Sequence, residues 1–274
     1  MIRGLSRAGI GSVSDEQFIT LAAKYGFGAV DLEAEALIAS HGLEGAKELL
    51  EQHQMLIGSI GLNVEWRGSE EQFLEGLKGL AASASAASSL GCKSCCTYIL
   101  PATDQNPALF MAQTVCRLRI ISEVLGAYGI KLGLEFVGPH HLRTAWKNPF
   151  IWTVHDTLTL IDAIAQPNVG LLVDAYHCYT TGYTADDIRK QLLPEQIVHV
   201  HINDAYDLPV EQLLDNDRLY PGEGVIDLQG FVQSLGDIGY RGVVAQEVIT
   251  PAISAGSPDD LFQRSKLGFD KVFS

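Results

Sequence analysis

The sequence predicts an α/β fold of the (β/α)8 type, a TIM barrel, as a single domain over residues 1–274. Apolar runs rich in β-branched residues alternate with helix-like segments along the chain, which is typical of parallel strands buried on both faces. Eight such units fit this length, since barrels of this class often have about 200–250 residues. Four metal-type side chains also stand at the ends of four different runs, where such a barrel places its active site.

The expected strands are the apolar runs that turn signals and polar segments separate. In chain order they are Ile2–Ile10, Gly28–Glu33, Leu56–Val64, Ser94–Tyr98, Lys131–Phe136, Val169–Asp174, Ile197–Ile202 and Val243–Val248. No GxGxxG or Walker-type loop follows an early strand. This argues against the alternative of a doubly wound sheet that binds a dinucleotide.

The segments between these runs predict helices. They include Ser14–Tyr25, Leu43–Gln54, Glu70–Leu90, Ala108–Tyr128, Val154–Ile164 and Leu228–Ile238. Ser14 and Gln17 have the spacing of a capping box, and Asp227 is placed to cap the helix that follows it. Glycine stands between helix and strand at several positions, where a left-handed backbone conformation ends a helix. These positions are Gly26, Gly91, Gly129 and Gly239.

Charge and hydropathy exclude two classes of partner. The formal net charge is −14, which argues against binding to duplex DNA, so no nucleic-acid partner is expected. An anionic substrate stays open, because a local arginine and a metal ion can override the overall field. No apolar run approaches the ~20 residues of a membrane span, and the N-terminus has no secretory signal pattern. No membrane association is expected.

The cysteines indicate a reducing compartment. There are five of them, and an odd count without a secretory signal favours the cytoplasm. Cys92 and Cys95 have the spacing of a metal or redox motif, with Cys96 next in the chain. No second Cys/His pair with zinc spacing follows. We therefore interpret the group as small apolar residues of a buried strand.

Glu135, Asp174, His201 and Glu247 are the predicted metal ligands. Each stands at the C-terminal end of one of the last four predicted strands, which are neighbours in a barrel, so the side chains can converge. Three carboxylates and an imidazole would repel one another's charge unless a divalent cation neutralised them. The donor set suits one Mn²⁺, Zn²⁺, Co²⁺ or Mg²⁺ ion. A lone polar residue at a strand end is the alternative for each position, but four in register favour a shared site.

Three histidines are candidates for the same site. His199 and His201 alternate onto one face of a strand, and His201 is chosen as the ligand because it is nearer the C-terminal end. His199 is predicted to lie one layer deeper, where it contacts the substrate or supports the site, or is simply buried. His177 follows Asp174 by three residues. If a helix begins there, His177 faces the site and can contact the substrate or the metal; otherwise it is a loop histidine hydrogen-bonded to a neighbour.

Two further residues are predicted to bind substrate. Arg218 precedes a Pro-Gly-x-Gly turn that is expected to fix a loop over the barrel mouth. Its planar guanidinium can orient a hydroxyl, carboxylate or phosphate; the alternative is a surface arginine paired with Asp215 or Asp217. Trp66 can supply an apolar wall for the C–H face of a sugar, and a core position is its alternative.

The motifs around these residues resemble the xylose isomerase-like TIM barrel family of the AP endonuclease family 2 superfamily. They are Leu134–Phe136, Leu172–His177, His201–Asp204, Arg218–Gly224 and Val244–Glu247. Within that family the chain is most similar to sugar phosphate isomerase/epimerase proteins of the inosose isomerase type. The similarity is strongest over Val169–Pro251, and weaker but compatible over Met1–Glu135.

The resemblance implies a divalent-metal-dependent isomerase or epimerase of a sugar, sugar phosphate or inosose. It implies one metal ion on Glu135, Asp174, His201 and Glu247. The two glutamates would serve as acid–base groups that move a proton through an enediolate. The alternatives are a ketoinositol dehydratase on the same scaffold, a metal-dependent hydrolase and a non-catalytic metabolite-binding barrel. The expected partner is a small-molecule sugar or polyol, and a homo-oligomer stays open.

Overall fold

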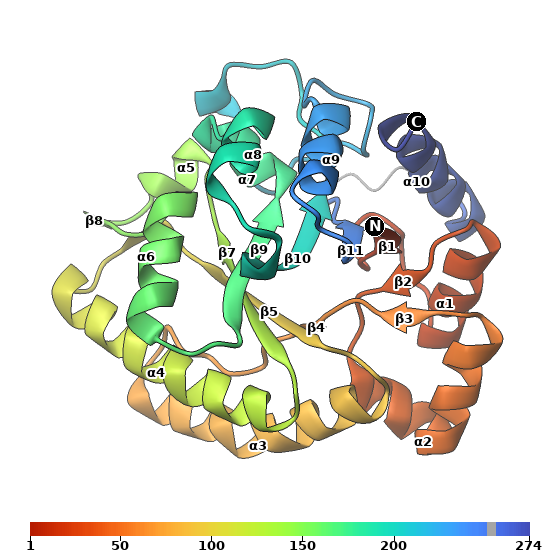
Figure 1. The fold of residues 1–274 in the computed structure, drawn as a ribbon, viewed down its shortest axis with the longest axis horizontal. Coiled ribbons are helices and arrows are strands. Elements are labelled where there is room, and N and C mark those ends of the chain that lie inside the picture. The colour runs from red at the N-terminus through yellow and green to blue at the C-terminus, as the bar shows by residue number, and fades with distance from the viewer. Residues whose placement is uncertain (251–255) are drawn as a thin grey trace.

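The computed structural model, which describes residues 1–250 and 256–274, is a nearly closed barrel surrounded by helices (Figure 1). Among the described residues, nine parallel strands pair in the order β3-β2-β1-β11-β10-β9-β7-β5-β4. These strands are β1 Ile2–Leu5, β2 Ala29–Val30, β3 Leu56–Ile57, β4 Ile60–Gly61, β5 Ser94–Ile99, β7 Lys131–Phe136, β9 Val169–Asp174, β10 Ile197–Ile202 and β11 Val243–Gln246. A separate antiparallel pair joins β6 Ala102–Thr103 and β8 Asn148–Pro149. The predicted (β/α)8 barrel is confirmed.

The predicted third strand, Leu56–Val64, is wrong as one element. It divides into β3, which pairs with β2, and β4, which pairs with β5. The chain changes its partner at Gly58 and Ser59, so neither pairing extends beyond two residues. This segment therefore joins the two ends of the sheet.

Three other predicted strands extended too far at the C-terminal end. β1 ends at Leu5, β2 at Val30 and β11 at Gln246. The next residues still bond to the neighbouring strands, since the backbone N–H groups of Asp31 and Glu247 donate to Leu5 and Ile202 at 2.8 and 3.0 Å. Asp31 and Glu247 also line a cavity at the barrel mouth.

Helices cover the outside of the barrel (Figure 1). Their bounds are α1 Asp15–Lys24, α2 Ala34–Gln52, α3 Glu70–Ser89, α4 Pro107–Ala127, α5 His140–Arg143, α6 Val154–Ile164, α7 Ala175–Thr181, α8 Ala185–Gln191, α9 Leu228–Asp237 and α10 Pro258–Val272, with 3-10 turns η1 Pro194–Gln196 and η2 Val210–Gln212. The predicted capping box is confirmed, since Ser14 and Gln17 exchange side chain-to-backbone hydrogen bonds of 3.2 Å. The Asp227 side chain accepts from the backbone N–H of Gly230 at 3.0 Å.

One helix is longer than its prediction. α2 begins at Ala34 rather than at Leu43, and it contains a kink at Gly42, where φ is 70°. The predicted segment corresponds to the part after the kink. Gly26 and Gly129 have φ values of 82° and 70°, as expected for glycines that end helices.

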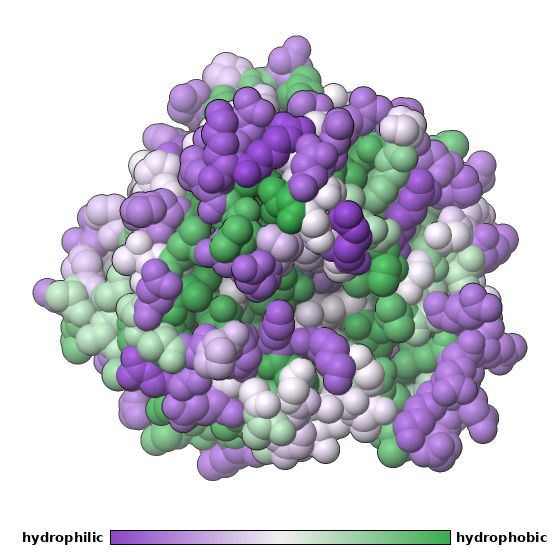
Figure 2. All heavy atoms as spheres, in the orientation of Figure 1, coloured by the Kyte–Doolittle hydropathy of each residue, from purple (hydrophilic) through white to green (hydrophobic). Residues whose placement is uncertain are grey.

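The core lies inside the barrel and between the strands and helices. Leu132 and Leu134 on β7 and Leu171 on the neighbouring strand β9 are fully buried. Hydrophilic side chains gather toward the outer edge of the face in Figure 2, for example over α2. In the described ranges, no helix is both long enough and apolar enough to span a membrane. The apolar core holds the strands in place, so the residues at their C-terminal ends have fixed positions at the barrel mouth.

Candidate metal centre

The structure brings together the four side chains that the sequence singled out. Glu135 lies on β7, Asp174 ends β9, His201 lies on β10 and Glu247 directly follows β11. One ligand-type atom from each lies within 4.8 Å of those from the other three. Parallel pairing of these neighbouring strands places the four residues at one rim. The sequence signal was therefore a reliable guide to their proximity, and their role as ligands stays a prediction.

The chemistry of the cluster fits a divalent cation. His201 Nδ1 lies 3.5 Å from Glu247 Oε2 and 3.9 Å from Glu135 Oε1. Glu135 Oε1 and His201 Nδ1 are buried, and neither has a hydrogen-bond partner in the described chain. Burial raises the pKa of Glu135 well above its usual value, and the charges of Glu247 and Asp174 add to the effect. An ion bound here would give both orphaned atoms a partner and offset the repulsion.

Arg218 completes the cluster from the loop after β10. Its side chain is buried, and Nη1 lies 3.1 Å from Asp174 Oδ2 and 3.2 Å from Glu247 Oε2. Nη2 forms a second ion pair with Asp215 Oδ1 at 2.8 Å. The predicted alternative of an Asp215 partner is thus present, but inside the protein rather than on its surface. Burial works against ionisation of Glu247, yet His201 and Arg218 outweigh it and lower its pKa to about 2.

His177 lies on a helix that Asp174 begins. Asp174 Oδ1 accepts from the backbone N–H of Tyr176 at 2.6 Å and of His177 at 3.3 Å. The helical condition for a His177 side chain facing the site is therefore met. His177 Nε2 lies 3.7 Å from Glu135 Oε1, while Nδ1 accepts from the backbone N–H of Gly138 at 3.3 Å. Burial lowers the pKa of His177.

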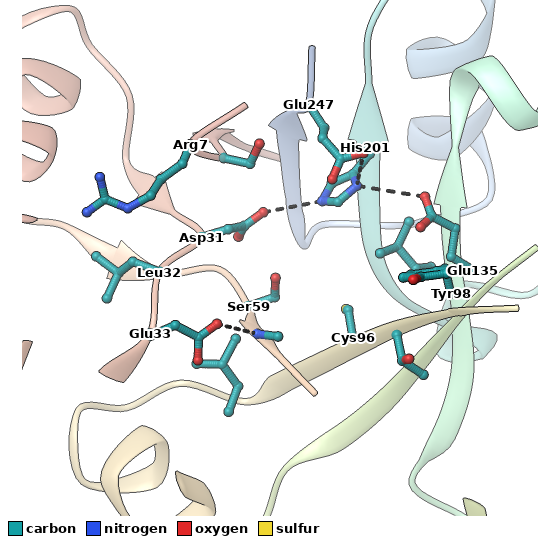
Figure 3. Close-up of a pocket in the computed structure, with 15 residues that line it drawn as sticks. Arg7, Asp31, Leu32, Glu33, Ser59, Cys96, Tyr98, Glu135, His201 and Glu247 are labelled. Carbon is teal, nitrogen blue, oxygen red and sulfur yellow. Dashed lines mark hydrogen bonds and ion pairs between the residues drawn. The ribbon is translucent and has the colours of Figure 1, made fainter. Parts of the chain in front are cut away.

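A cavity of about 320 Å³ opens beside the cluster. Glu135, His201 and Glu247 line one side of it, and Asp31 and Glu33 line another (Figure 3). Its size suits a small molecule. The carboxylates face the space where such a molecule would sit.

Asp31 is a site residue that sequence reasoning missed. Its Oδ2 atom lies 2.9 Å from His199 Nε2 and 3.3 Å from His201 Nε2. Burial opposes its ionisation, but the two histidines outweigh this effect and lower the pKa of Asp31. The available signal was a carboxylate that interrupts an apolar run, which continues with Leu32. The predicted strand ran to Glu33 and concealed it.

The four residues predicted as substrate contacts are all buried, and none of them lines the cavity: His177, Arg218, Trp66 and His199. Trp66 is 1% exposed, and its indole N–H donates to Thr97 Oγ1 at 3.1 Å. Thr97 lines the cavity, so Trp66 lies behind the wall rather than on it. His199 is likewise 1% exposed and contacts Asp31, one layer deeper than His201, as its strand position predicts.

The cysteines are separate from the four-residue cluster. All five are free; Cys92 and Cys95 are buried, and Cys96 contributes to the cavity wall. Burial raises the pKa of Cys92 to about 11. A buried thiol of this kind stays protonated and packs as a small apolar group.

Fold and site together define a (β/α)8 barrel with a polar, metal-type centre at its C-terminal mouth. The chain belongs to the xylose isomerase-like TIM barrel family, whose model matches residues 19–266. This confirms the resemblance that the motifs indicated.

Among curated proteins, the chain is 32% identical over 146 residues to an inosose isomerase from Bacillus subtilis strain 168, covering 53% of this chain and 50% of that protein. It is 25% identical over 160 residues to a ketose 3-epimerase from Arthrobacter globiformis, covering 58% of the chain and 47% of that protein. It is 26% identical over 141 residues to a 3-dehydroshikimate dehydratase from Pseudomonas putida, covering 50% and 21%. The matched part thus spans about half or less of each relative.

Solved structures match over nearly the whole chain. A xylose isomerase domain protein from Alicyclobacillus acidocaldarius superposes with a TM-score of 0.91 at 34% identity, covering 99% of this chain and 98% of that one. A structure described as the IOLI protein with a binding zinc atom has a TM-score of 0.84 at 22% identity, covering 99% and 98%. The second likeness shows the shared fold alone.

Proposed function

We propose that this protein is a divalent-metal-dependent isomerase or epimerase of a small sugar, sugar phosphate or inosose. The observation that carries the proposal is the convergence of Glu135 and Glu247 with Asp174 and His201 at one rim. Binding a metabolite alone would not need two glutamates in the ligand set. The names of the inosose isomerase and ketose 3-epimerase relatives support the same reaction class.

Glu135, Asp174, His201 and Glu247 would hold the metal ion. The chemistry that an ion held there would supply is polarisation of a substrate carbonyl, which would make the proton on the adjacent carbon more acidic. Glu135 and Glu247 come from β7 and from the end of β11, which lie on either side of β9 and β10 in the sheet, so the two carboxylates flank His201. One carboxylate takes the proton from carbon, and the same or the other glutamate returns it.

The position to which the proton returns decides the product. Return to the neighbouring carbon gives isomerisation, and return to the opposite face of the same carbon gives epimerisation. We propose that His177 and Arg218 influence this choice through the two glutamates. Both side chains are buried behind the cavity wall, with His177 Nε2 3.7 Å from Glu135 Oε1 and Arg218 Nη1 3.2 Å from Glu247 Oε2.

Solvent-proton exchange tests the proposal. The protein, loaded with Mn²⁺, is incubated in D₂O with a panel of ketoses and inososes, and deuterium uptake at carbon is followed by NMR. The wild type should incorporate deuterium into at least one sugar, while Glu135→Gln and Glu247→Gln should nearly abolish uptake because an amide cannot accept the proton. Glu51→Gln on the exposed face of α2 is the matched control. Wild-type uptake in either site variant would remove that glutamate from the proton path.

A dehydratase is the second candidate, because two 3-dehydroshikimate dehydratases are similar to 50% of this chain. It would use the same proton abstraction and then expel a hydroxyl from the next carbon. The exchange experiment separates the two, since a dehydratase converts substrate into an unsaturated product. A hydrolase or a binding-only barrel would show no exchange. A hydrolase with two metals would also carry more than one ion per chain by elemental analysis.

A further inference from the structure

We infer that Asp31 is a positioning residue of this metal centre. Its carboxylate holds His199 and His201 with hydrogen on Nε2 and so leaves Nδ1 of His201 as the atom that binds the ion. The inference rests on the proposed function for the presence of the metal. It assigns a role to a residue outside the four-residue cluster.

The geometry places Asp31 behind the ligand histidine. In Figure 3 the His201 ring lies between Asp31 on one side and Glu135 on the other, with Glu247 close to the ring. Asp31 Oδ2 is 3.3 Å from His201 Nε2, and the opposite ring atom, Nδ1, points toward the two glutamates. The same Oδ2 is 2.9 Å from His199 Nε2. One carboxylate oxygen therefore meets both histidines.

The chemistry of imidazole decides where the hydrogens are. An ionised carboxylate only accepts hydrogen bonds, and a neutral imidazole has one N–H and one lone pair. Both Nε2 atoms must therefore carry hydrogen to bond with Asp31. In neutral His201 this leaves a lone pair on Nδ1, the buried atom that has no hydrogen-bond partner among residues 1–250 and 256–274. A carboxylate behind a ligand histidine fixes the orientation of the ring and increases its basicity.

The backbone makes room for this arrangement at Gly58. A Cβ atom there would lie 2.5 Å from Asp31 Oδ1 and 3.3 Å from His199 Cε1. Only glycine fits so close to both side chains. Gly58 is also the point where the chain passes from β3 to β4, so the break in the predicted third strand coincides with the space that Asp31 occupies.

A rival arrangement uses Asp31 as a ligand. Asp31, His199 and His201 offer three atoms within 4.8 Å of one another, which is also sufficient for an ion. That ion would take the lone pair of His201 Nε2 and place hydrogen on Nδ1. A neutral His201 has only one ring lone pair, so it cannot bind one ion through Nε2 and another through Nδ1. We favour the positioning role because the other cluster supplies four ligand atoms and contains the orphaned Nδ1.

Two measurements on the full chain with Zn²⁺ as the probe test the inference. NMR of protein labelled with ¹⁵N in the histidine rings reports which nitrogen carries hydrogen and which binds zinc. Competition with a chelator reports the zinc affinity of the wild type, Asp31→Asn, Gly58→Ala and Glu33→Gln. Glu33 lines the same cavity but accepts from the backbone N–H of Gly61, so its variant is the matched control.

We expect hydrogen on Nε2 of both histidines and zinc on Nδ1 of His201 in the wild type. The wild type should bind one zinc ion per chain. Asp31→Asn and Gly58→Ala should weaken zinc binding by about 10–100-fold. Glu33→Gln should have the zinc affinity of the wild type. Zinc on Nε2 of His201, or wild-type affinity in folded Asp31→Asn, would overturn the inference. The wild-type spectrum decides the first point even if a variant fails to fold. Zinc binding with this pattern but without sugar exchange would overturn only the proposed function.

Discussion

Arg218 Nη1 lies 3.1 Å from Asp174 Oδ2, and both side chains are buried. The same Asp174 oxygen accepts from Asn203 Nδ2 at 3.0 Å. Arg218 comes from the loop after β10, and Asp174 ends β9, so a buried ion pair fastens this loop to the barrel mouth. The guanidinium also supplies positive charge to a cluster of three carboxylates. A bound cation would share that task.

Arg218→Met should destabilise the metal-free protein strongly. Removing one partner of a buried ion pair leaves unpaired charge and costs about 3–5 kcal/mol. Adding Mn²⁺ should restore more stability to the variant than to the wild type, because the ion compensates the same carboxylates. Urea unfolding with chelator and with Mn²⁺ measures both effects.

The control for this variant is Arg189→Met, which removes an exposed arginine paired with Asp186 and Asp237. It should lose no more than about 1 kcal/mol, with or without Mn²⁺. An equal loss for Arg218→Met in the presence and absence of the ion would show that Arg218 does not compensate the cluster.

We expect Asp204 to stabilise the loop after β10, just as Arg218 is expected to offset the negative charge of the cluster. Its buried carboxylate accepts from the backbone N–H groups of Gly222, Gly224, Ile226 and Ala205 at 2.9–3.0 Å. Asp204→Asn turns an N–H₂ group toward some of these donors, and each buried unsatisfied group costs about 1–3 kcal/mol. We expect a total loss of about 2–4 kcal/mol and faster proteolysis within residues 205–226.

Asp207→Asn is the matched control, since Asp207 is an exposed residue of the same loop. It should change the free energy of unfolding by no more than about 0.5 kcal/mol. If Asp204→Asn behaved like it, the Pro-Gly-x-Gly turn would hold the loop without help from this carboxylate.

The sequence was informative wherever one side chain could be placed by strand periodicity. Glu135, Asp174 and His201 are the last or last-but-one residues of runs whose bounds the structure reproduces, so their convergence followed from parallel pairing. Asp31 could not be found in this way, because its run continues with apolar Leu32 and the end of β2 depends on pairing with β1 and β3. The order of residues within an apolar run does not show where the strand stops pairing with its neighbouring strands.

Contacts between distant segments were also beyond the sequence. The sequence allowed two positions for Trp66, a sugar-binding wall or the core. Its apolar side chain suits both positions equally. Only the positions of Thr97 and Arg117, which bond the Trp66 indole and carbonyl, place the ring behind the wall. Likewise, nothing near Arg218 in the sequence indicates that Glu247 becomes its partner.

Trp66→Phe should therefore affect stability and leave substrate binding unchanged. The variant loses the hydrogen bond to Thr97 and some packing against Phe110, whose ring is stacked on the indole, at a cost of about 1–2 kcal/mol. Tyr98→Ala is the counterpart, since Tyr98 lines the cavity and is 45% exposed. It should raise KM with little change in kcat. A raised KM in Trp66→Phe with unchanged stability would return the indole to the substrate-binding wall.

The two histidines of β10 provide the sharpest test of the metal centre. His201 Nδ1 faces Glu135 and Glu247, whereas His199 Nε2 faces Asp31. His201→Ala should lose the ion, because a ligand atom disappears and three carboxylates cannot be held together as tightly. His199→Ala should keep one ion per chain while losing stability or activity, since only the support behind the ligand is removed. Elemental analysis of folded, monodisperse protein measures the metal content of each variant.

Both histidines are buried on one strand, so general damage to the core would affect the two alike. Equal metal loss in both variants would mean that the ion is not selected by Nδ1 of His201, and the four-residue centre would have to be redrawn around Asp31.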